Sequence, residues 1–472
     1  SDLWKIAAPG DAKLMESTGA GATIIDGAIG ELRRVILDAI GVVMADPETM
    51  GKGDLSARAL SMLHAPMLDV VSCLAEDYGD ALRAIVGMFA RMIVSPEGAA
   101  GVHLLSAGAA RPLPAYVAWK KAPALIVHSS TTIETRRSAF GTSVITPSDQ
   151  LYIRNNLPAP DASIVADRDA WVIAIDGVRN PRKFTLGELK TMGLETMAMV
   201  LQCSGNGRGF FPSKPSGTPW QVGAAGCVMW SGVPVKQVVQ ALGGVAGGMR
   251  FMTGTGGEKL PEGVDPRSVI VERSLPLAAM EDAMLAWEMN GEPLPLAHGG
   301  PLRLVVPGYT GVNSIKYVKS LAFTERETDA RIMSHGYRIS PPGAQGDPSQ
   351  PSVLEMNVKS WINGPLPEGG TVKSGTVQIH GVAFGGANAL QRVEVSTDGG
   401  RTWAAARLVG PDLGKYAWWQ FVFPARLTPG DYVLASRAVD ARGNVQPEQR
   451  VENAAGYNNN SWSDHAVRVK VA

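Results

Sequence analysis

The chain has 472 residues, which is long for one ordinary core, so we expect two or three domains. Hydrophobic residues make up 45% and charged residues 19% of it, a balance typical of globular and not of disordered proteins. The formal net charge is zero, which argues against a nucleic-acid-binding protein, whose signature is a strong basic excess. Charges, glycines and prolines interrupt every apolar run before about 18 residues, so we expect no membrane span.

Residues 1–125 are predicted to form a helical N-terminal extension. Apolar residues recur there at three- and four-residue spacing in two stripes, from Ile29 to Val43 and from Val70 to Ile93. Cys73 lies on the second stripe and is interpreted as a buried apolar thiol. The chain starts at Ser1 without an apolar leader, as expected of a processed mature protein or of a shortened one.

Residues 126–345 are predicted to form a mixed α+β domain. Short apolar segments predict strands at 171–177, 197–202 and 302–308, and helical spacing occupies 233–244 and 278–291. Glycine- and proline-rich loops separate these elements. Such loops are where a rigid scaffold usually carries binding and catalytic residues.

A segment rich in proline, glycine and serine, residues 339–352, predicts a linker to a third domain at 350–472. Strands are predicted there at 376–384, 390–396 and 431–440, with a turn signal at 397–400. Short strands separated by turns favour an immunoglobulin-like sandwich. The fold class expected for the chain is therefore α+β, with this sandwich at its C-terminal end.

Several common catalytic motifs are missing. The segment TGTGGEK, residues 253–259, resembles a phosphate loop but lacks the required Gly-Lys-Ser/Thr ending. The histidines form no His-Glu-x-x-His pattern, which argues against a zinc hydrolase, and no Gly-x-Ser-x-Gly elbow occurs. Three cysteines are too few for a disulfide scaffold.

The segment VLQCSGNGRGFF, residues 200–211, places Cys203 at the end of a predicted strand. Three interpretations remain open: a buried structural thiol, a disulfide with Cys227, or a nucleophile or soft metal ligand. The alternating glycines that follow let a bulky group approach the sulfur, and Arg208 adds a cation suited to an anion. These surroundings favour a functional cysteine.

Four segments together resemble, in order, signatures of the sulfite oxidase family of molybdenum enzymes. They are RNNLPAP at 154–160, CSGNGR at 203–208, AWEMNGEPLP at 286–295 and HGGPLRLVVPG at 298–308. The segments VEVSTDGGRTW and AVDARGNVQP, further along the chain, resemble the family's immunoglobulin-like dimerisation domain. One such match would be weak evidence, but the four segments and the C-terminal domain make five matches in the family's order, which is specific.

The resemblance implies a molybdopterin cofactor whose molybdenum is bound by the Cys203 thiolate. It implies cofactor contacts at Tyr152, Ile153, Arg154, Asn155, Asn156, His298, Arg303, Ser314, Ile315 and Lys316. It implies catalytic roles for Cys203, Arg154, Arg208, Trp220 and Trp287. The implied reaction is oxo transfer to a sulfur compound, with electrons passing singly to a separate acceptor such as a c-type cytochrome, because no Cys-x-x-Cys-His haem motif occurs.

Three positions depart from the family pattern. Asn156 stands where the family has histidine, Trp287 where we place its active-site tyrosine, and Ala455 where it often has arginine. The leading hypothesis is a sulfite or related sulfur-compound dehydrogenase. An oxo-transfer reductase on the same cofactor and a non-catalytic binding or assembly protein are the alternatives. The resemblance also implies a periplasmic homodimer that acts on a small anionic sulfur substrate.

Overall fold

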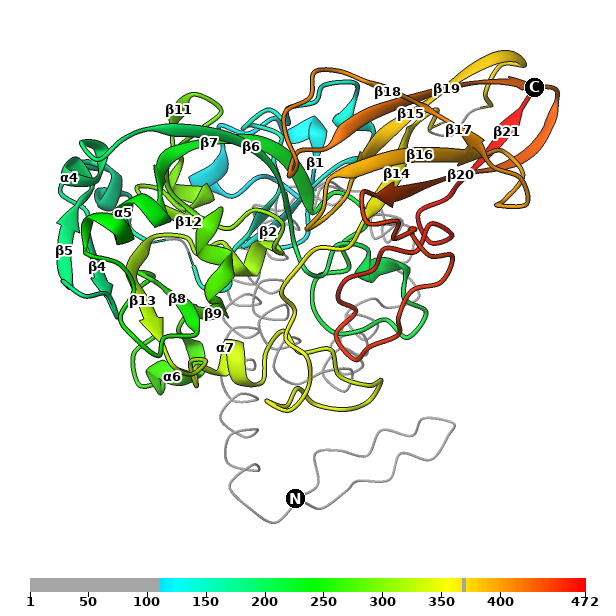
Figure 1. The fold of residues 1–472 in the computed structure, drawn as a ribbon. Helices are drawn as coiled ribbons and strands as arrows, with labels where there is room; N and C mark the ends of the chain where they lie inside the picture. Colours follow the sequence, from blue (N-terminus) through cyan, green and yellow to red (C-terminus); the bar gives the residue numbers. More distant parts are fainter. Residues whose placement is uncertain (1–110, 159, 367–370) are drawn as a thin grey trace, which may run out of the picture. The chain divides into compact units, whose positions relative to one another are not determined.

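The computed structural model describes residues 111–158, 160–366 and 371–472 (Figure 1). The predicted helical stripes of the N-terminal extension, with Cys73, lie outside these ranges. Within them, strands dominate and the helices are short: α4 (Leu186–Lys190), α5 (Val235–Ala241), α6 (Pro266–Val269) and α7 (Arg331–Ser334). None of these helices has the length and apolar character needed to cross a membrane.

A small antiparallel sheet opens the described part of the chain. It comprises β1 (Leu125–Val127), β2 (Thr132–Thr135) and β3 (Ile153–Arg154). Thr132 pairs with Arg154 and Ile133 with Ile153, so the sheet fixes the RNNLPAP segment at its start. The Ile153 side chain is fully buried in the core of this sheet, with Val117 and Leu125.

The second sheet carries the cysteine. Its strands are β6 (Glu195–Gln202), β7 (Ala225–Pro234), β10 (Met284–Met289), β11 (Glu292–Pro293) and β12 (Arg303–Val305), and β6 and β7 pair antiparallel up to Gln202 and Ala225. The helix predicted at 278–291 is wrong: a short 3-10 turn, Leu277–Glu281, precedes strand β10 there. Residues on both faces of β10 are buried, and such a run cannot be distinguished from a helix by spacing alone.

The third sheet is mixed and has the order β5 (Arg182–Thr185), β4 (Val172–Asp176), β13 (Val318–Thr324), β8 (Phe251–Gly256) and β9 (Glu272–Pro276). Strand β13 runs parallel to β4 and antiparallel to β8. The main core lies between this sheet and one face of the second sheet, and helix α5 contributes Val235, Val238 and Val239 to it. Helix α5 confirms the helical spacing at 233–244, and strands β4, β6 and β12 confirm the three predicted strands.

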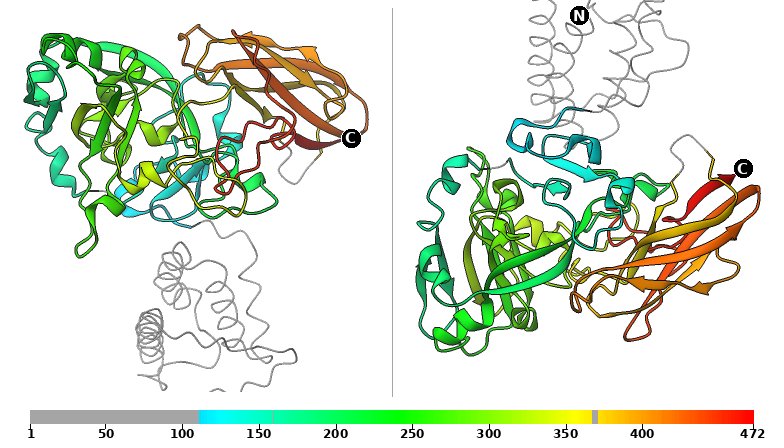
Figure 2. Two further views of the ribbon diagram at one scale, coloured as in Figure 1. Left: turned by 60° about the horizontal axis from the view of Figure 1, so that its bottom comes forward. Right: turned by 90° about the horizontal axis from the view of Figure 1, so that it is seen from above.

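The C-terminal region contains two four-stranded sheets that share a core (Figure 2). One has the order β14 (Lys359–Gly364), β15 (Gly375–Phe384), β19 (Trp419–Leu427) and β18 (Arg407–Val409). The other has the order β17 (Ala404–Ala405), β16 (Leu390–Ser396), β20 (Gly430–Asp440) and β21 (Val467–Val471). Strands β15, β16 and β20 confirm the predicted strands, and alternate residues of β21 point into the core.

The segment predicted as a linker, 339–352, contains neither helix nor strand. A bridge between Arg338 and Ser352 closes it into a loop, and the buried guanidinium of Arg338 donates to the carbonyls of Met333 and Gln350. The segment is therefore anchored at its base. This anchoring matters because Tyr337, the neighbour of Arg338, reaches the pocket described next.

Candidate active site

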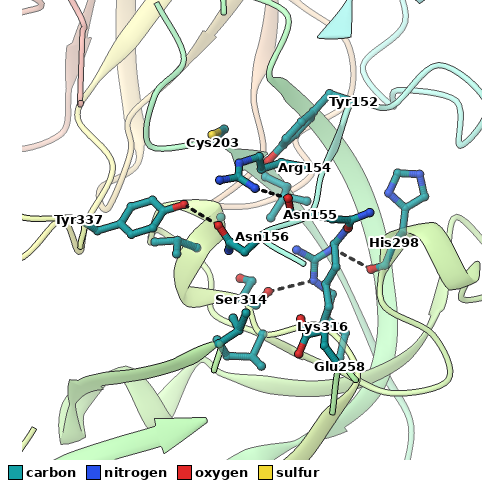
Figure 3. Close-up of a pocket in the computed structure, with 16 residues that line it drawn as sticks. Tyr152, Arg154, Asn155, Asn156, Cys203, Glu258, His298, Ser314, Lys316 and Tyr337 are labelled. Atoms are coloured by element: carbon teal, nitrogen blue, oxygen red, sulfur yellow. Dashed lines mark hydrogen bonds between the residues drawn. The ribbon is translucent and has the colours of Figure 1, made fainter. Parts of the chain in front are cut away.

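A pocket lies where the ends of β3, β6 and β12 meet the loops after β8 and β12 (Figure 3). Nearly all predicted cofactor contacts line it, although they come from segments far apart in the sequence. Its lining includes Tyr152, Arg154, Asn155, Asn156, Cys203, His298, Arg303, Ser314, Ile315 and Lys316. Ile153 alone among these predictions does not line it, because its side chain faces the core of the small sheet.

Cys203 follows the last residue of β6, and its sulfur reaches the pocket. Its backbone N–H donates to the Ala224 carbonyl at 2.8 Å, which continues the pairing with the segment before β7. The residue is 7% exposed, and its thiol is free. Cys227 is also free and lies in a different core cluster, where burial raises the pKa of its thiol to about 12. The disulfide interpretation is therefore wrong.

Basic side chains gather at one end of the pocket. We call His298, Arg303 and Lys316 the cationic end; His298 and Arg303 are buried, Lys316 is partly buried, and their hydrogen-bond partners are neutral. The Lys316 ammonium donates to Asn155 Oδ1 at 2.5 Å and to the Ala297 carbonyl at 2.6 Å. Burial and the neighbouring Arg303 hold the pKa of Lys316 well below its usual range, and burial and Lys120 do the same for His298.

Two charged residues near this end were missed in the sequence. Glu258 comes from the TGTGGEK segment and lines the pocket, where burial raises the pKa of its carboxyl to about 7. Lys120 is buried beneath the small sheet, donates to the carbonyls of Ser148 and Leu151 at 2.7 Å, and has its pKa lowered by burial to about 7. Only tertiary structure shows that these charges are buried, so no sequence signal marked them.

Trp287 does not occupy the position predicted for it. It is 6% exposed and packs in the main core, and it does not line the pocket. The phenol comes instead from Tyr337, whose hydroxyl donates to Asn156 Oδ1 at 3.3 Å. Tyr337 was missed because it stands in a loop with no recognised motif. Its left-handed backbone, with φ of 52°, is unusual for a residue with a side chain and requires support from its neighbours.

Trp220 and Arg208 lie behind the pocket wall. Trp220 is fully buried beside Cys203 and contacts the ring of Tyr152 edge-on, at 6.3 Å between ring centroids. Arg208 is 8% exposed and donates to the carbonyls of Ala455 at 2.7 Å and Thr218 at 3.1 Å. A Cβ at Gly205 would collide with the Arg208 guanidinium, so the glycine after Ser204 makes room for this cation.

Comparison with known proteins shows the family. Residues 158–332 match the oxidoreductase molybdopterin binding domain, and residues 350–471 match the Mo-co oxidoreductase dimerisation domain. The sulfite oxidase of Arabidopsis thaliana is 31% identical over 365 residues, which cover 72% of this chain and 91% of that protein. The chain belongs to the sulfite oxidase family.

The chain spans less than two thirds of the length of two other members of the family. The mitochondrial sulfite oxidases of Macaca fascicularis and Homo sapiens are 33% and 32% identical over 350 residues, and the chain spans 62% of the length of each. The sulfane dehydrogenase SoxCD from Paracoccus pantotrophus shares the fold, with a TM-score of 0.61, 24% identity, and coverage of 80% of this chain and 98% of that one.

The residues of the pocket fit the family's molybdenum cofactor. The Cys203 thiol is a soft ligand of the kind that binds such a metal, and the cationic end suits the phosphate of molybdopterin. Among the described residues, the buried Nε2 of His298 has no hydrogen-bond partner, and Glu258 is the one carboxylate that lines the pocket. A bound anion would supply the missing acceptor and offset the excess of positive charge.

Proposed function

We propose that this family member oxidises a small anionic sulfur compound, sulfite or a close relative of it. The observation that carries the proposal is that one pocket gathers the Cys203 thiol, the Arg154 guanidinium and the Tyr337 phenol (Figure 3). The thiol is the metal ligand, and the other two groups suit an oxyanion. When bound, the cofactor supplies oxygen-atom transfer and accepts two electrons.

The protein's own residues bind and orient the substrate in this proposal. Arg154 lines the pocket, and Arg208 lies behind the Cys203 loop, where it donates to the neutral carbonyls of Ala455 and Thr218. Cations near a buried site attract an anion and stabilise charge that develops on it. The Tyr337 hydroxyl, held by Asn156, can donate a hydrogen bond or a proton to an oxygen atom in the pocket.

The residue at position 455, an alanine, bears on the class of substrate. The family often has an arginine there, whereas Ala455 offers only its backbone carbonyl, which accepts from Arg208 Nε. One fewer cation favours a substrate that is larger or less charged than the sulfite dianion. The absent charge-assisted contact would be worth on the order of 1.5–3 kcal/mol.

The proposal extends to assembly and electron transfer. The match of residues 350–471 to a dimerisation domain supports a homodimer. The strand orders β14-β15-β19-β18 and β17-β16-β20-β21 support an immunoglobulin-like sandwich, in which the first four strands correspond to A, B, E and D. A c-type cytochrome is the proposed electron acceptor, and the periplasm the proposed location.

Steady-state kinetics test the proposal. Purified protein containing molybdenum should reduce cytochrome c or ferricyanide when sulfite or a related sulfur anion is added. The loss of this activity in the Cys203→Ser variant at unchanged protein fold would support it. A molybdenum-loaded protein that reduces neither acceptor with any sulfur anion would refute it.

A further inference from the structure

The C-terminal domain reaches the Cys203 loop through residues 455–459, part of the loop between β20 and β21. Three hydrogen bonds join the two segments. The Arg208 Nε donates to the Ala455 carbonyl at 2.7 Å, and the Asn458 N–H donates to the Ser204 carbonyl at 2.9 Å. The Asn459 side chain donates to the Gly207 carbonyl at 3.0 Å. The domain matched as a dimerisation domain is therefore also bound directly to the loop that carries the thiol.

Tyr457 stands in the middle of this contact. Its ring stacks on the ring of Tyr337, with centroids 5.1 Å apart and an angle of 13° between the planes. The Arg208 guanidinium carbon lies over the Tyr457 ring, 5.3 Å from its centroid. The Tyr457 ring thus contacts two groups of the proposed site, the Tyr337 ring and the Arg208 guanidinium.

A second guanidinium, that of Arg273, lies near the Tyr337 ring. Its guanidinium carbon lies 5.6 Å from the centroid of the Tyr337 ring, and the residue is fully buried. Within the described ranges, Arg273 donates to four neutral oxygens, those of Asn313, Ile332, Ser352 and Val353. Each ring of the stacked pair therefore has a guanidinium near it, Arg273 at Tyr337 and Arg208 at Tyr457.

This arrangement has two physical consequences. An aromatic face attracts a guanidinium without neutralising it, so Arg208 is held in place and keeps its charge for an anion. Stacking also fixes the plane of the Tyr337 ring, whose backbone has the unfavourable φ of 52° and would otherwise relax. A carboxylate in place of the Tyr457 ring would hold Arg208 equally well but would cancel its charge.

We propose that Tyr457 is a positioning residue that orients Tyr337 and Arg208 for an oxyanion in the pocket, and so sets the affinity for substrate. The inference rests on the proposed function and assigns to the C-terminal domain a part in the active site. The ring of Tyr457, and not its hydroxyl, provides both contacts. Burial raises the pKa of Tyr457 to about 12, so its hydroxyl stays protonated across the neutral range.

The test compares Tyr457→Phe with Tyr457→Leu in the molybdenum-loaded protein. Phenylalanine keeps the flat ring, and leucine removes it. Tyr432→Leu is the matched control, because Tyr432 packs against the core of the same C-terminal domain without lining the pocket. Three quantities are measured for each variant: the sulfate dissociation constant without turnover, KM and kcat with sulfite, and molybdenum content.

For Tyr457→Leu we expect the sulfate dissociation constant and KM to rise about fivefold to tenfold, with molybdenum content unchanged. Tyr457→Phe and Tyr432→Leu should stay within about twofold of the wild type. Unchanged sulfate binding and KM in Tyr457→Leu, or an equal loss in Tyr457→Phe, would overturn the role of the ring. A wild type that neither binds sulfate nor oxidises a sulfur anion would overturn the proposed function, and this inference with it.

Discussion

The Lys316 ammonium donates to Asn155 Oδ1 over 2.5 Å and so joins two segments that are 161 positions apart in the chain. Asn155 belongs to the RNNLPAP segment, and Lys316 follows the loop after β12. The same ammonium donates to the Ala297 carbonyl, one residue before His298. Lys316 therefore joins three segments at the pocket, and both of its acceptors in the described part of the chain are neutral.

Replacement of Lys316 should impair retention of the cofactor. The variant Lys316→Met loses one charge-assisted contact, worth on the order of 1.5–3 kcal/mol, so affinity should fall about tenfold to a hundredfold. Molybdenum content by mass spectrometry and pterin fluorescence after denaturation both report this loss. Lys190→Met is the control, since Lys190 is an exposed lysine paired with Asp169. Equal molybdenum content in the two variants would contradict the assignment.

Anion binding to the cofactor-free pocket should consume protons. Burial lowers the pKa of Lys120 to about 7, so its ammonium loses charge as pH rises toward 8, and burial lowers the pKa of Lys316 and of His298 in the same direction. Burial raises the pKa of Glu258 to about 7, so its carboxyl gains charge over the same range. A bound anion favours the protonated form of every one of these groups.

Inorganic phosphate is the probe for this prediction. Its affinity should fall between pH 6 and pH 8, and calorimetry in buffers of different ionisation heat should show net proton uptake by the protein. Glu258→Gln should weaken the pH dependence, because it removes one of the titrating groups. Net proton release on binding would contradict the picture of a desolvated cationic end.

Tyr337 and Trp287 offer a paired comparison. Tyr337→Phe removes the hydroxyl that lies in the pocket, so kcat/KM should fall by about 10²-fold or more, as is usual for loss of a proton-donating group. Trp287→Tyr changes a core residue, so it should lower the melting temperature and leave KM nearly unchanged. If Trp287→Tyr alone altered KM, the sequence-based placement of Trp287 at the substrate would be restored.

Ala455→Arg tests the substrate class. The new cation would lie beside Arg208 and Gly456, and it should lower KM for sulfite about tenfold or more by adding a charge-assisted contact. Ala455→Leu adds comparable bulk without charge and serves as the control. Micromolar KM for sulfite in the wild type, unimproved by arginine, would show that the missing charge is supplied elsewhere.

Local sequence predicted the parts of the site that depend on strand ends and glycines. The apolar run before Cys203 reads as a buried strand, and the small residues after it indicate an open loop, which is how β6 and its loop are built. The run at 278–291 failed because β10 is buried on both faces and lacks an alternating pattern. Trp287 was placed at the site because AWEMNG resembles a family signature, and that match does not determine where the side chain packs.

The remaining groups depend on contacts between distant segments. Tyr337 enters the pocket because an anchored loop and the Tyr457 ring hold it there, and neither is visible in the residues around it. Lys120 and Glu258 look like ordinary surface charges in the sequence. Their shifted pKa values arise from burial, which only the packed structure determines.

X-ray absorption at the molybdenum edge tests the central claim most directly, that Cys203 is the protein's ligand in this pocket. Wild type and Cys203→Ser would be compared at equal molybdenum content, with Cys227→Ser as the control, because Cys227 is buried in another cluster. The account predicts one fewer sulfur neighbour at the metal in Cys203→Ser and an unchanged sulfur count in Cys227→Ser. An unchanged count in Cys203→Ser would contradict it.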